Sequence, residues 1–426
     1  MRIGLLGCGI VGGALVELLS ERRPFIEETT GVDLEVAAVA VRSTSKQRSD
    51  LVDTSLLTTD AAALVRDPSI DVIVEVIGGI EPARSLIVTA LESGKSVVTA
   101  NKELLANVGA ELYAIADANK VDLLFEAAAA GAIPIVRPLR ESLLGEDLTA
   151  VTGILNGTTN YILTRMSVDG ADYGDALSEA QRLGYAERDP TADVEGFDAG
   201  AKAAIMASLA FGHNVVAGDV YHEGIASISQ DDIAFARRLG YEIKLLGIAE
   251  RFDDPSGTEL AVRVHPAMVP CAHPLAAVRD SFNAVFVEGT AAGEIMFYGR
   301  GAGGLPTASA VLGDLIVAAT NKARGTYRPV PSGPRARIRS IDDLESAFYV
   351  NLEVGDAPGV LAAVAGVFGR HGVSIRSMEQ EGLGHGARIA FITHGALERN
   401  LQATLQDLRG LDVVTDIRGV LRVIGE

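Results

Sequence analysis

The chain begins with a short apolar run and a glycine-rich turn, Ile3-Gly4-Leu5-Leu6-Gly7-Cys8-Gly9-Ile10-Val11-Gly12, and a helical pattern follows at once over residues 13–21. The turn has the form G-x-G-x-x-G, and its position between a strand and a helix is typical of a dinucleotide-binding βαβ unit. The first glycine permits the tight turn, the second lets the backbone approach a pyrophosphate, and the third lets the helix pack close to the strand. This stretch predicts a Rossmann-type fold, although a ligand-free turn is the alternative. The residues expected to bind a cofactor here are Gly7, Gly9, Ile10, Val11 and Gly12.

Further apolar runs follow this turn at regular intervals. Helical patterns such as 83–93 and 104–119 separate the runs, which cover residues 34–41, 72–77, 96–99 and 121–126. Strands that are apolar on both faces and alternate with helices indicate a parallel sheet covered on both sides. The sequence therefore predicts an α/β fold, with a doubly wound parallel sheet over residues 1–135 that the apolar helix 305–320 completes.

The rest of the chain follows two other patterns. Residues 136–304 contain helical segments followed by strands, which predicts an α+β domain for substrate binding and dimerisation. Residues 321–345 are basic and rich in proline, and they resemble a linker. Residues 346–426 follow the order βαββαβ, which predicts a ferredoxin-like module. Because the linker separates this module from the rest of the chain, we expect that catalysis does not need the module.

Composition limits the partners of the chain. Its 426 residues suit about three domains. With 37 basic and 56 acidic residues the formal net charge is −19, which does not suit nucleic acid or anionic lipid. No apolar run reaches the roughly 18 residues of a membrane span, and the N-terminus has no signal-peptide layout. Two cysteines exclude a disulfide scaffold and favour a reducing compartment. We expect a cytoplasmic protein with no nucleic-acid or membrane partner.

Two lysines are the candidates for chemistry. Thr99 and Lys102 follow the fourth strand, at the sheet edge where α/β proteins bind ligands, so both are candidates for contacting a cofactor. By itself, Lys102 is more typical of a surface lysine. Asp198 and Lys202 are four residues apart on an otherwise apolar helix, which favours a partly buried Lys202 rather than a surface ion pair. Burial would lower the pKa of this lysine and Asp198 would raise it, and the sequence does not decide between them.

Charged residues elsewhere suggest which ligands are bound. Glu187, Asp189 and Asp193 lie in a loop before the helix and suit a substrate ammonium, with a solvated acidic loop as the alternative. The second strand ends without the acid that holds the ribose of NAD, and Arg42 and Lys46 could bind a 2′-phosphate instead. This favours NADP, with NAD still possible, unless the two cations are merely solvated. A zinc site at His265, Cys271 and His273 is disfavoured by their spacing.

These motifs together resemble the homoserine dehydrogenase family over nearly the whole chain. Further matching stretches are Glu75–Gly79, Ala100–Lys102, Gly153–Ile162 and Gly301–Ala308. The family signature matches without exception at Ala180, Gly184, Tyr185, Ala186, Glu187, Asp189, Pro190, Asp193, Val194, Gly196, Asp198 and Lys202. The resemblance implies NAD(P)-dependent interconversion of L-homoserine and L-aspartate 4-semialdehyde, in the biosynthesis of threonine, methionine and isoleucine.

The resemblance also implies roles for single residues. Lys202 is the expected acid/base, and Lys102 is expected to support proton transfer and to contact the cofactor. Glu187 and Asp198 are expected to hold the substrate, and Gly303 to reach the nicotinamide. A sodium ion is expected near the domain hinge. Its expected ligands are the side chain of Glu126 and the backbone carbonyls of Ala129, Gly131 and Ile133.

The C-terminal module resembles an ACT domain, with Asp356–Leu361 at its first strand–helix turn. Such modules pair across chains and bind amino acids, so we expect threonine as an effector and a homodimer or homotetramer. A purely structural dimerisation module is the alternative. Two other interpretations of the whole chain compete: another Rossmann dehydrogenase acting on an amino-acid aldehyde or alcohol, and a non-catalytic sensor. The sensor has no use for two lysines beside Glu187 and Asp198.

Overall fold

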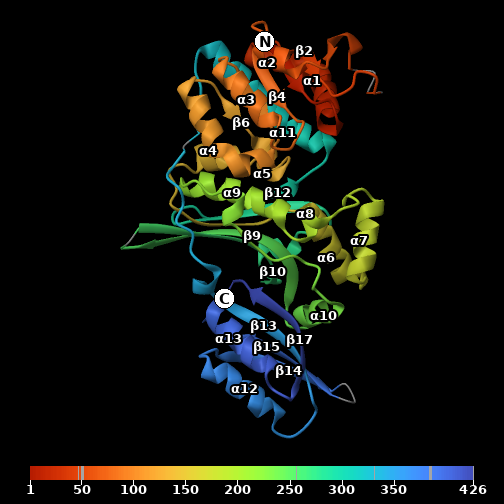
Figure 1. Ribbon diagram of the computed structural model, residues 1–426, viewed down its shortest axis with the longest axis vertical. Helices are drawn as coiled ribbons and strands as arrows, with labels where there is room; N and C mark the ends of the chain where they lie inside the picture. The colour runs from red at the N-terminus through yellow and green to blue at the C-terminus, as the bar shows by residue number, and fades with distance from the viewer. Residues whose placement is uncertain (47, 49–51, 256, 331, 383–385, 426) are drawn as a thin grey trace.

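The structure is a computed structural model that describes residues 1–46, 48, 52–255, 257–330, 332–382 and 386–425. Its three parts are stacked along the long axis of the molecule (Figure 1). The N-terminal dinucleotide-binding fold is at the top, the mixed α+β part is in the middle, and the C-terminal module is at the bottom.

A six-stranded parallel sheet forms the N-terminal part, in the order β3-β2-β1-β4-β5-β6. This is the strand order of the Rossmann fold, so the sequence prediction is confirmed. The strands are β1 (Arg2–Leu6), β2 (Glu35–Ala40), β3 (Leu57–Thr58), β4 (Val72–Glu75), β5 (Ser96–Thr99) and β6 (Leu123–Leu124). The helices are α1 (Ile10–Thr30), α2 (Ala61–Arg66), α3 (Ala83–Glu92), α4 (Lys102–Ala118), α5 (Glu126–Ala130) and α11 (Gly304–Arg324).

Helices cover both faces of this sheet because its strands are apolar on both faces. Leu15 and Leu19 of α1 share one buried cluster with Val311 and Leu315 of α11. The residues of α2, α3 and α4 that face the sheet belong to the other cluster. Helix α11, from late in the chain, therefore lies beside α1 in the first domain, as expected (Figure 1). The strand expected over residues 121–126 is shorter in the structure: β6 covers only Leu123–Leu124, because α5 begins at Glu126.

The middle part combines helices with the larger sheet. Its strands are β7 (Leu148–Ile154), β8 (Tyr221–His222), β9 (Tyr241–Asp254), β10 (Gly257–Pro270), β11 (Phe282–Gly289) and β12 (Gly293–Arg300). Its helices are α6 (Gly157–Asp169), α7 (Tyr173–Arg182), α8 (Thr191–Val194), α9 (Phe197–Phe211) and α10 (Gln230–Arg238). The sequence predicts helices followed by strands here, whereas β7 precedes the helices. Strand β12 has no buried face and is rich in glycine and charge, which hides its strand pattern.

The C-terminal module has the predicted βαββαβ order, with one short extra strand. It comprises β13 (Glu345–Val354), α12 (Val360–Arg370), β14 (Ile375–Gly382), β15 (Ala387–Thr393), β16 (Ala396–Leu397), α13 (Glu398–Arg409) and β17 (Val414–Val423). Its sheet is not separate from the middle part. Strand β17 pairs in parallel with β10, through Ala267 with Arg422 and Met268 with Val423, which gives one sheet in the order β12-β11-β7-β9-β10-β17-β13-β15-β14.

The segment between α11 and β13 is held on the surface rather than hanging free. Arg335 forms an ion pair with Asp219, and Arg337 and Arg339 both pair with Glu259. The N–H of Arg339 also donates to the carbonyl of Leu260. The arginines that made this segment look like a linker therefore hold it against acidic residues of the middle part.

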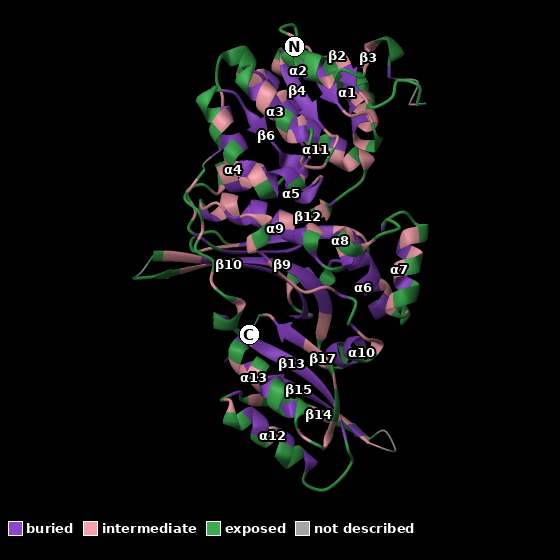
Figure 2. Ribbon diagram, in the orientation of Figure 1, coloured by how far each residue is buried: buried purple, intermediate pink, exposed green. Residues whose placement is uncertain are grey.

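Burial follows the sheets. Figure 2 shows buried residues along the strands of both sheets and in α5, whereas α7 buries little more than Ala176 and Ala180. Within the described ranges, no helix has the length and apolar character needed to cross a membrane.

Candidate active site

The glycine-rich turn has the geometry that its glycines predict. Gly7 has a φ of +99°, which side chains rarely adopt. A Cβ on Gly12 would lie 2.4 Å from the carbonyl oxygen of Gly7, so only glycine lets α1 start this close to β1. At Gly9 a Cβ would meet nothing within 4 Å, which leaves space beside the first turn of α1. Backbone N–H groups at a helix N-terminus favour a phosphate in such a space.

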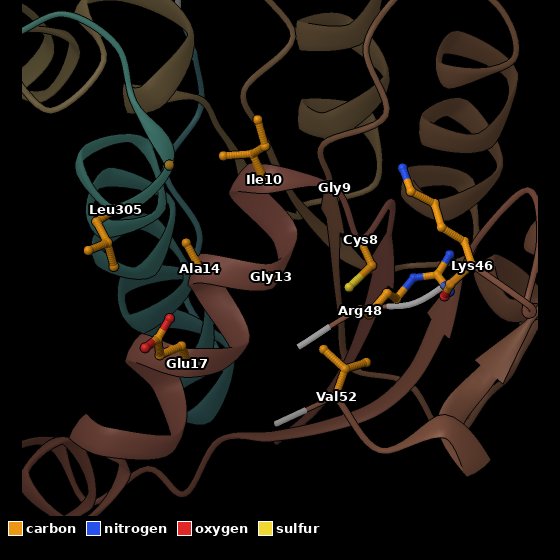
Figure 3. Close-up of a pocket in the computed structure, with 11 residues that line it drawn as sticks. Cys8, Gly9, Ile10, Gly13, Ala14, Glu17, Lys46, Arg48, Val52 and Leu305 are labelled. Carbon is orange, nitrogen blue, oxygen red and sulfur yellow. The ribbon is translucent and has the colours of Figure 1, made fainter. Parts of the chain in front are cut away.

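A cavity of about 570 Å³ lies beside this turn (Figure 3). The turn contributes Gly9 and Ile10 to it, and two cations, Lys46 and Arg48, line the other side. Arg48 is fixed by its guanidinium, which donates to the carbonyls of Lys46 and Ser43, each at 2.8 Å. The sequence analysis missed Arg48, although it follows Lys46 by only two residues. Arg42 is exposed and does not line this cavity.

A larger cleft of about 1270 Å³ lies between the dinucleotide-binding part and the middle part. The dinucleotide-binding part contributes Val11 and Lys102 to its lining, the middle part contributes Asp198 and Lys202, and Gly303 lines it at the start of α11. Gly303 has a φ of +123° at the start of α11, and the Cβ of its neighbour Gly304 would lie 2.8 Å from Ile10. The close approach of α11 to α1 thus depends on glycine.

Asp198 joins the two lysines in the cleft. Its carboxylate lies 2.7 Å from Nζ of Lys202 and 3.1 Å from Nζ of Lys102. Lys202 also donates to the carbonyl of Leu155 at 2.7 Å. An ammonium has three donors, so Lys202 keeps one for a ligand. The side chain of Lys202 is 9% exposed and that of Lys102 is 43% exposed, so the predicted burial of Lys202 is confirmed.

The charges in this group decide its protonation. Burial raises the pKa of Asp198, but the ammonium groups of Lys202 and Lys102 outweigh burial and hold this pKa well below its ordinary value. Asp198 raises the pKa of Lys102 in return, against the effect of burial. Asp198 is therefore a poor proton acceptor.

Asn156 connects this group to the loop acids. Its side-chain amide donates to Asp193 at 2.7 Å and to Asp198 at 2.9 Å, and its carbonyl oxygen caps α6 by accepting from the N–H of Thr159. Burial raises the pKa of Asp193, and the hydrogen bond from Asn156 opposes this. The sequence analysis quoted Asn156 within a motif but assigned it no role.

Glu187 and Asp189 line the same cleft from the loop before α8. Glu187 is exposed, and its position on the cleft wall leaves its carboxylate accessible to a ligand. Asp189 instead accepts hydrogen bonds from Thr191, which lowers its pKa. The cleft therefore brings together both lysines proposed for chemistry and the four acidic residues Glu187, Asp189, Asp193 and Asp198.

Glu75 is a buried carboxylate that the sequence analysis did not single out. It accepts hydrogen bonds from the N–H groups of Ile77 and Gly78, and from the hydroxyl of Thr99 at 2.5 Å. The same hydroxyl accepts from the N–H of Asn101, the residue that caps α4 in front of Lys102. Thr99 is thus turned away from the cleft and supports the loops that line it.

The residues expected at a sodium site lie beneath the cleft, at α5 and the following turn. Glu126, Ala129, Gly131 and Ile133 are buried. The Glu126 carboxylate accepts from the N–H groups of Ile135, Val136 and Arg137 at 2.6, 2.7 and 3.0 Å.

The three residues weighed for zinc have other surroundings. His265 is buried in β10, Cys271 is exposed, and His273 accepts a hydrogen bond from the N–H of Leu275. Within the part of the chain that the structure describes, no group of three histidine, cysteine, aspartate or glutamate side chains is arranged to hold a metal ion.

A Rossmann sheet, a glycine-rich turn and an interdomain cleft with two lysines define a nicotinamide-dependent dehydrogenase. Comparison with known families makes this specific. The family model "Homoserine dehydrogenase, NAD binding domain" matches residues 7–126, "Homoserine dehydrogenase" matches residues 134–316, and "ACT domain" matches residues 348–413. The chain belongs to the homoserine dehydrogenase family.

Individual relatives agree. The homoserine dehydrogenase of Corynebacterium glutamicum is 50% identical over 423 residues, which are 99% of this chain and 95% of the relative. The crystal structure of a homoserine dehydrogenase from Thiobacillus denitrificans has a TM-score of 0.93 at 39% identity and covers 99% of this chain and 98% of its own. A hyperthermophilic archaeal homoserine dehydrogenase in complex with NADPH has a TM-score of 0.64 at 30% identity, and the match covers 74% of this chain and 97% of its own. The chain is therefore an oxidoreductase of amino-acid biosynthesis that interconverts homoserine and aspartate semialdehyde.

Proposed function

We propose that Lys202 is the acid/base of this reaction and that Lys102 assists it. A nicotinamide cofactor in the cleft would supply the acceptor for the hydride that leaves the alcohol carbon of homoserine, and the proton of the hydroxyl group needs a base. Lys202 is held at two of its three donor positions, by Asp198 and the carbonyl of Leu155, so its remaining position can face that oxygen. Asp198 keeps both lysines in place. This fixed geometry is the observation that carries the proposal.

The substrate ammonium is then bound by carboxylates of the neighbouring loop and of α8. Glu187 and Asp193 line the cleft without contacting either lysine, and both suit a cation. Asp198 contributes indirectly, since Asn156 links it to Asp193. A substrate bound in this way has its ammonium at the loop and its hydroxyl at the lysines.

The test compares two matched variants, Lys202→Met and Lys102→Met, by the initial rate of homoserine oxidation. Loss of a general acid or base typically costs about 10²–10⁴-fold in rate. We expect that loss in kcat for Lys202→Met, with cofactor affinity nearly intact, and a smaller loss for Lys102→Met. Near-normal turnover of Lys202→Met would move the role to Lys102.

We further propose a preference for NADP over NAD. Lys46 and Arg48 support it, because both line the cavity beside the glycine-rich turn. The archaeal relative was solved with NADPH. A charge-assisted contact to a phosphate is worth about 1.5–3 kcal/mol, so Arg48→Ala should weaken NADP binding roughly tenfold to hundredfold and spare NAD. Arg42→Ala is the matched control. If only Arg42→Ala weakens NADP binding, the contact with the 2′-phosphate belongs to Arg42, as the sequence suggested.

A sodium ion is proposed at the loop after α5. The candidate ligands, Glu126 and the carbonyls of Ala129, Gly131 and Ile133, are all oxygens, which suits a hard cation. Three N–H groups already hold the Glu126 carboxylate, and a carboxylate has about four acceptor positions, so one is left. Sodium should raise the melting temperature of the protein relative to choline at equal ionic strength. Glu126→Gln should remove that difference.

Threonine is proposed as an effector acting through the ACT module, in a homodimer or homotetramer in the cytoplasm. The support is the family match over residues 348–413 and, for the compartment, the two free cysteines, Cys8 and Cys271. Titrating threonine against the full-length enzyme tests the effector, and light scattering gives the oligomer. If threonine changes neither the rate nor the melting temperature, it is not an effector of this enzyme.

A further inference from the structure

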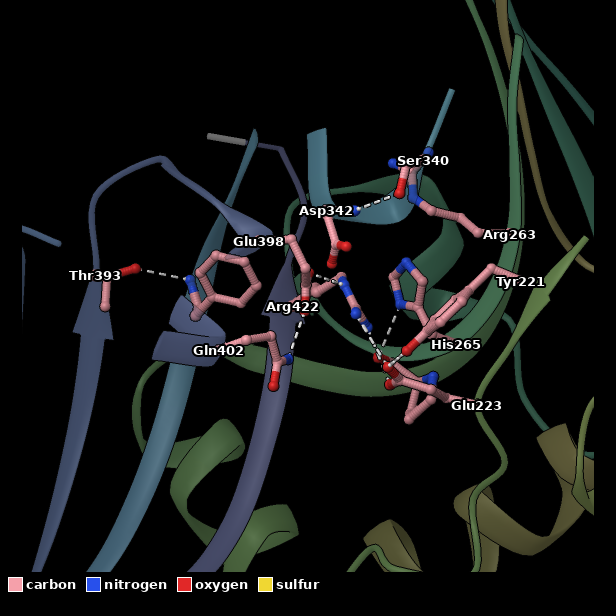
Figure 4. Close-up of polar contacts among 12 residues, drawn as sticks. Tyr221, Glu223, Arg263, His265, Ser340, Asp342, Thr393, Glu398, Gln402 and Arg422 are labelled. Carbon is pink, nitrogen blue, oxygen red and sulfur yellow. Dashed lines mark hydrogen bonds and ion pairs between the residues drawn. The ribbon is translucent and has the colours of Figure 1, made fainter. Parts of the chain in front are cut away.

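A buried arginine from the last strand joins the ACT module to the middle part (Figure 4). The Arg422 guanidinium binds both oxygens of Glu223, at 2.9 and 3.0 Å, and its Nε donates to Glu398 at 2.9 Å. The side chain of Arg422 is only 5% exposed, and that of Glu398 is 4% exposed. The guanidinium carbon of Arg422 also lies 5.5 Å from the ring centre of Tyr221, whose hydroxyl donates to Glu223. Glu223 belongs to the middle part, and Arg422 and Glu398 belong to the ACT module.

The segment around Glu223 leads from this arginine to the substrate side of the cleft. The N–H of Glu223 donates to the carbonyl of Val264 at 2.7 Å, and the N–H of Ile225 donates to the carbonyl of Val194 at 2.9 Å. A Cβ on Gly224 would lie 2.5 Å from the same Val194 carbonyl. Val194 is the last residue of α8 and follows Asp193 directly. The segment is therefore packed between β10 and the helix that carries one of the proposed substrate-binding acids.

His222 makes a second contact with the same wall. It lines the large cleft, and its ring centre lies 5.0 Å from that of Phe197, the first residue of α9. A Cβ on Gly200 would lie 2.0 Å from Nε2 of His222, so the imidazole rests directly on the α9 backbone. Asp198 and Lys202 flank this contact on α9. A shift of the segment 221–225 therefore moves both α8 and α9.

We propose that Arg422 is a positioning residue for the homoserine pocket: its paired contact with Glu223 holds the segment 221–225 against α8 and α9. The proposal rests on the proposed binding of the substrate ammonium by Glu187 and Asp193. It assigns a function in the catalytic site to the C-terminal strand itself, in the absence of any effector. The ACT module is then part of the pocket's support, and a chain that ends near Arg339 lacks that support.

The expected effect follows from the burial of this group. In Arg422→Met the two carboxylates that bind the arginine lose their shared cation: Glu398 is buried, and Glu223 is 33% exposed and can turn towards water. An uncompensated charge does not stay buried without cost, so Glu223 turns towards water and the segment moves with it. Changes along such a contact network alter ligand binding by roughly 2- to 30-fold. We expect a rise of that size in KM for homoserine, with cofactor KM unchanged and kcat altered less.

The experiment compares Arg422→Met with Arg418→Met in the full-length enzyme. Arg418 lies on the same strand and pairs with Glu353 and Asp416, both within the ACT module, so it is a matched control. Arg422→Lys keeps the charge but loses the paired geometry, and it should give an intermediate KM. If Arg422→Met does not fold, Arg422→Lys and Glu223→Gln carry the test, and each should raise homoserine KM while cofactor KM stays constant.

The outcomes separate this inference from the proposed function. A homoserine KM in Arg422→Met or Arg422→Lys equal to that of Arg418→Met overturns the inference. Equal changes in homoserine KM and cofactor KM also overturn it, because they indicate a general loss of structure. If Glu187→Gln and Asp193→Asn leave homoserine KM unchanged, the proposed substrate contact is wrong, whatever Arg422 does.

Discussion

Replacing Asp198 by asparagine should move the pH dependence of homoserine oxidation to lower pH. Asp198 lies 2.7 Å from Nζ of Lys202 and 3.1 Å from Nζ of Lys102, and its charge raises the pKa of Lys102. Oxidation requires a neutral lysine to accept the hydroxyl proton, so the rate should rise as the lysine deprotonates. Asp198→Asn keeps the shape of the side chain and removes the charge that opposes this deprotonation.

The size of the shift follows from the geometry. Two unit charges about 3 Å apart interact by roughly 1.4–5.5 kcal/mol for an effective dielectric constant between about 80 and 20. The side chains of Asp198 and Lys202 are 11% and 9% exposed, so water screens this pair weakly. An opposite charge at such a distance typically shifts a pKa by about 1–3 units. We therefore expect the rising limb of kcat to move down by about 1–3 pH units.

The assay is the initial rate of cofactor reduction at saturating homoserine, between about pH 7 and pH 11. The maximal rate should fall as well, because Asp198 also positions both lysines. Asp189→Asn is the control, since Asp189 lines the same cleft but its carboxylate is bound to Thr191. An unchanged limb in Asp198→Asn, or a limb moved to higher pH, would show that neither lysine is the base.

Other perturbations test neighbouring parts of the site and the fold. Glu187→Gln should mainly raise KM for homoserine, because it weakens the ion pair to the ammonium; a rise in cofactor KM alone would refute the assignment. Glu75→Gln should lower the free energy of unfolding by about 1–3 kcal/mol in a urea titration, since the fully buried carboxylate accepts three hydrogen bonds; an unchanged midpoint would contradict this. Asp314 has its pKa raised to about 6, by burial first and by Glu126 next, so its contribution to stability is full below about pH 4 and is lost as pH rises through about 6. Unfolding curves of Asp314→Asn should lack that slope, which amounts to roughly 3 kcal/mol, and an identical pH dependence in both proteins would show that the shift is absent.

The local parts of the fold could be predicted because their causes are local. The run Ile3–Leu6, the spacing of Gly7, Gly9 and Gly12, and the four-residue spacing of Asp198 and Lys202 all act within a few residues. The structure confirms the strand, the turn and the buried lysine.

The parts that could not be predicted depend on contacts between distant residues. The pairing of β17 with β10 joins residues more than 150 positions apart through two register pairs, and neither strand carries a signal for it. Glu75 lies inside the apolar run 72–77, and nothing in that run indicates that its carboxylate accepts a hydrogen bond from Thr99. Of the two cations expected to bind a 2′-phosphate, Lys46 lines the cavity and Arg42 does not; Arg48 was missed because it lies two residues beyond Lys46, past the stretch that follows the second strand.

The position of α11 has a consequence for the order in which the protein can fold during synthesis. Its residues Ala308, Val311 and Leu315 are fully buried in the same cluster as Ile3 and Leu5 of the first strand. The last strand of the N-terminal sheet, β6, ends at Leu124 and α11 begins at Gly304, so one face of the sheet stays partly uncovered while about 180 further residues are made, including the whole middle part. Apolar surface exposed for that time is a risk for aggregation on the ribosome.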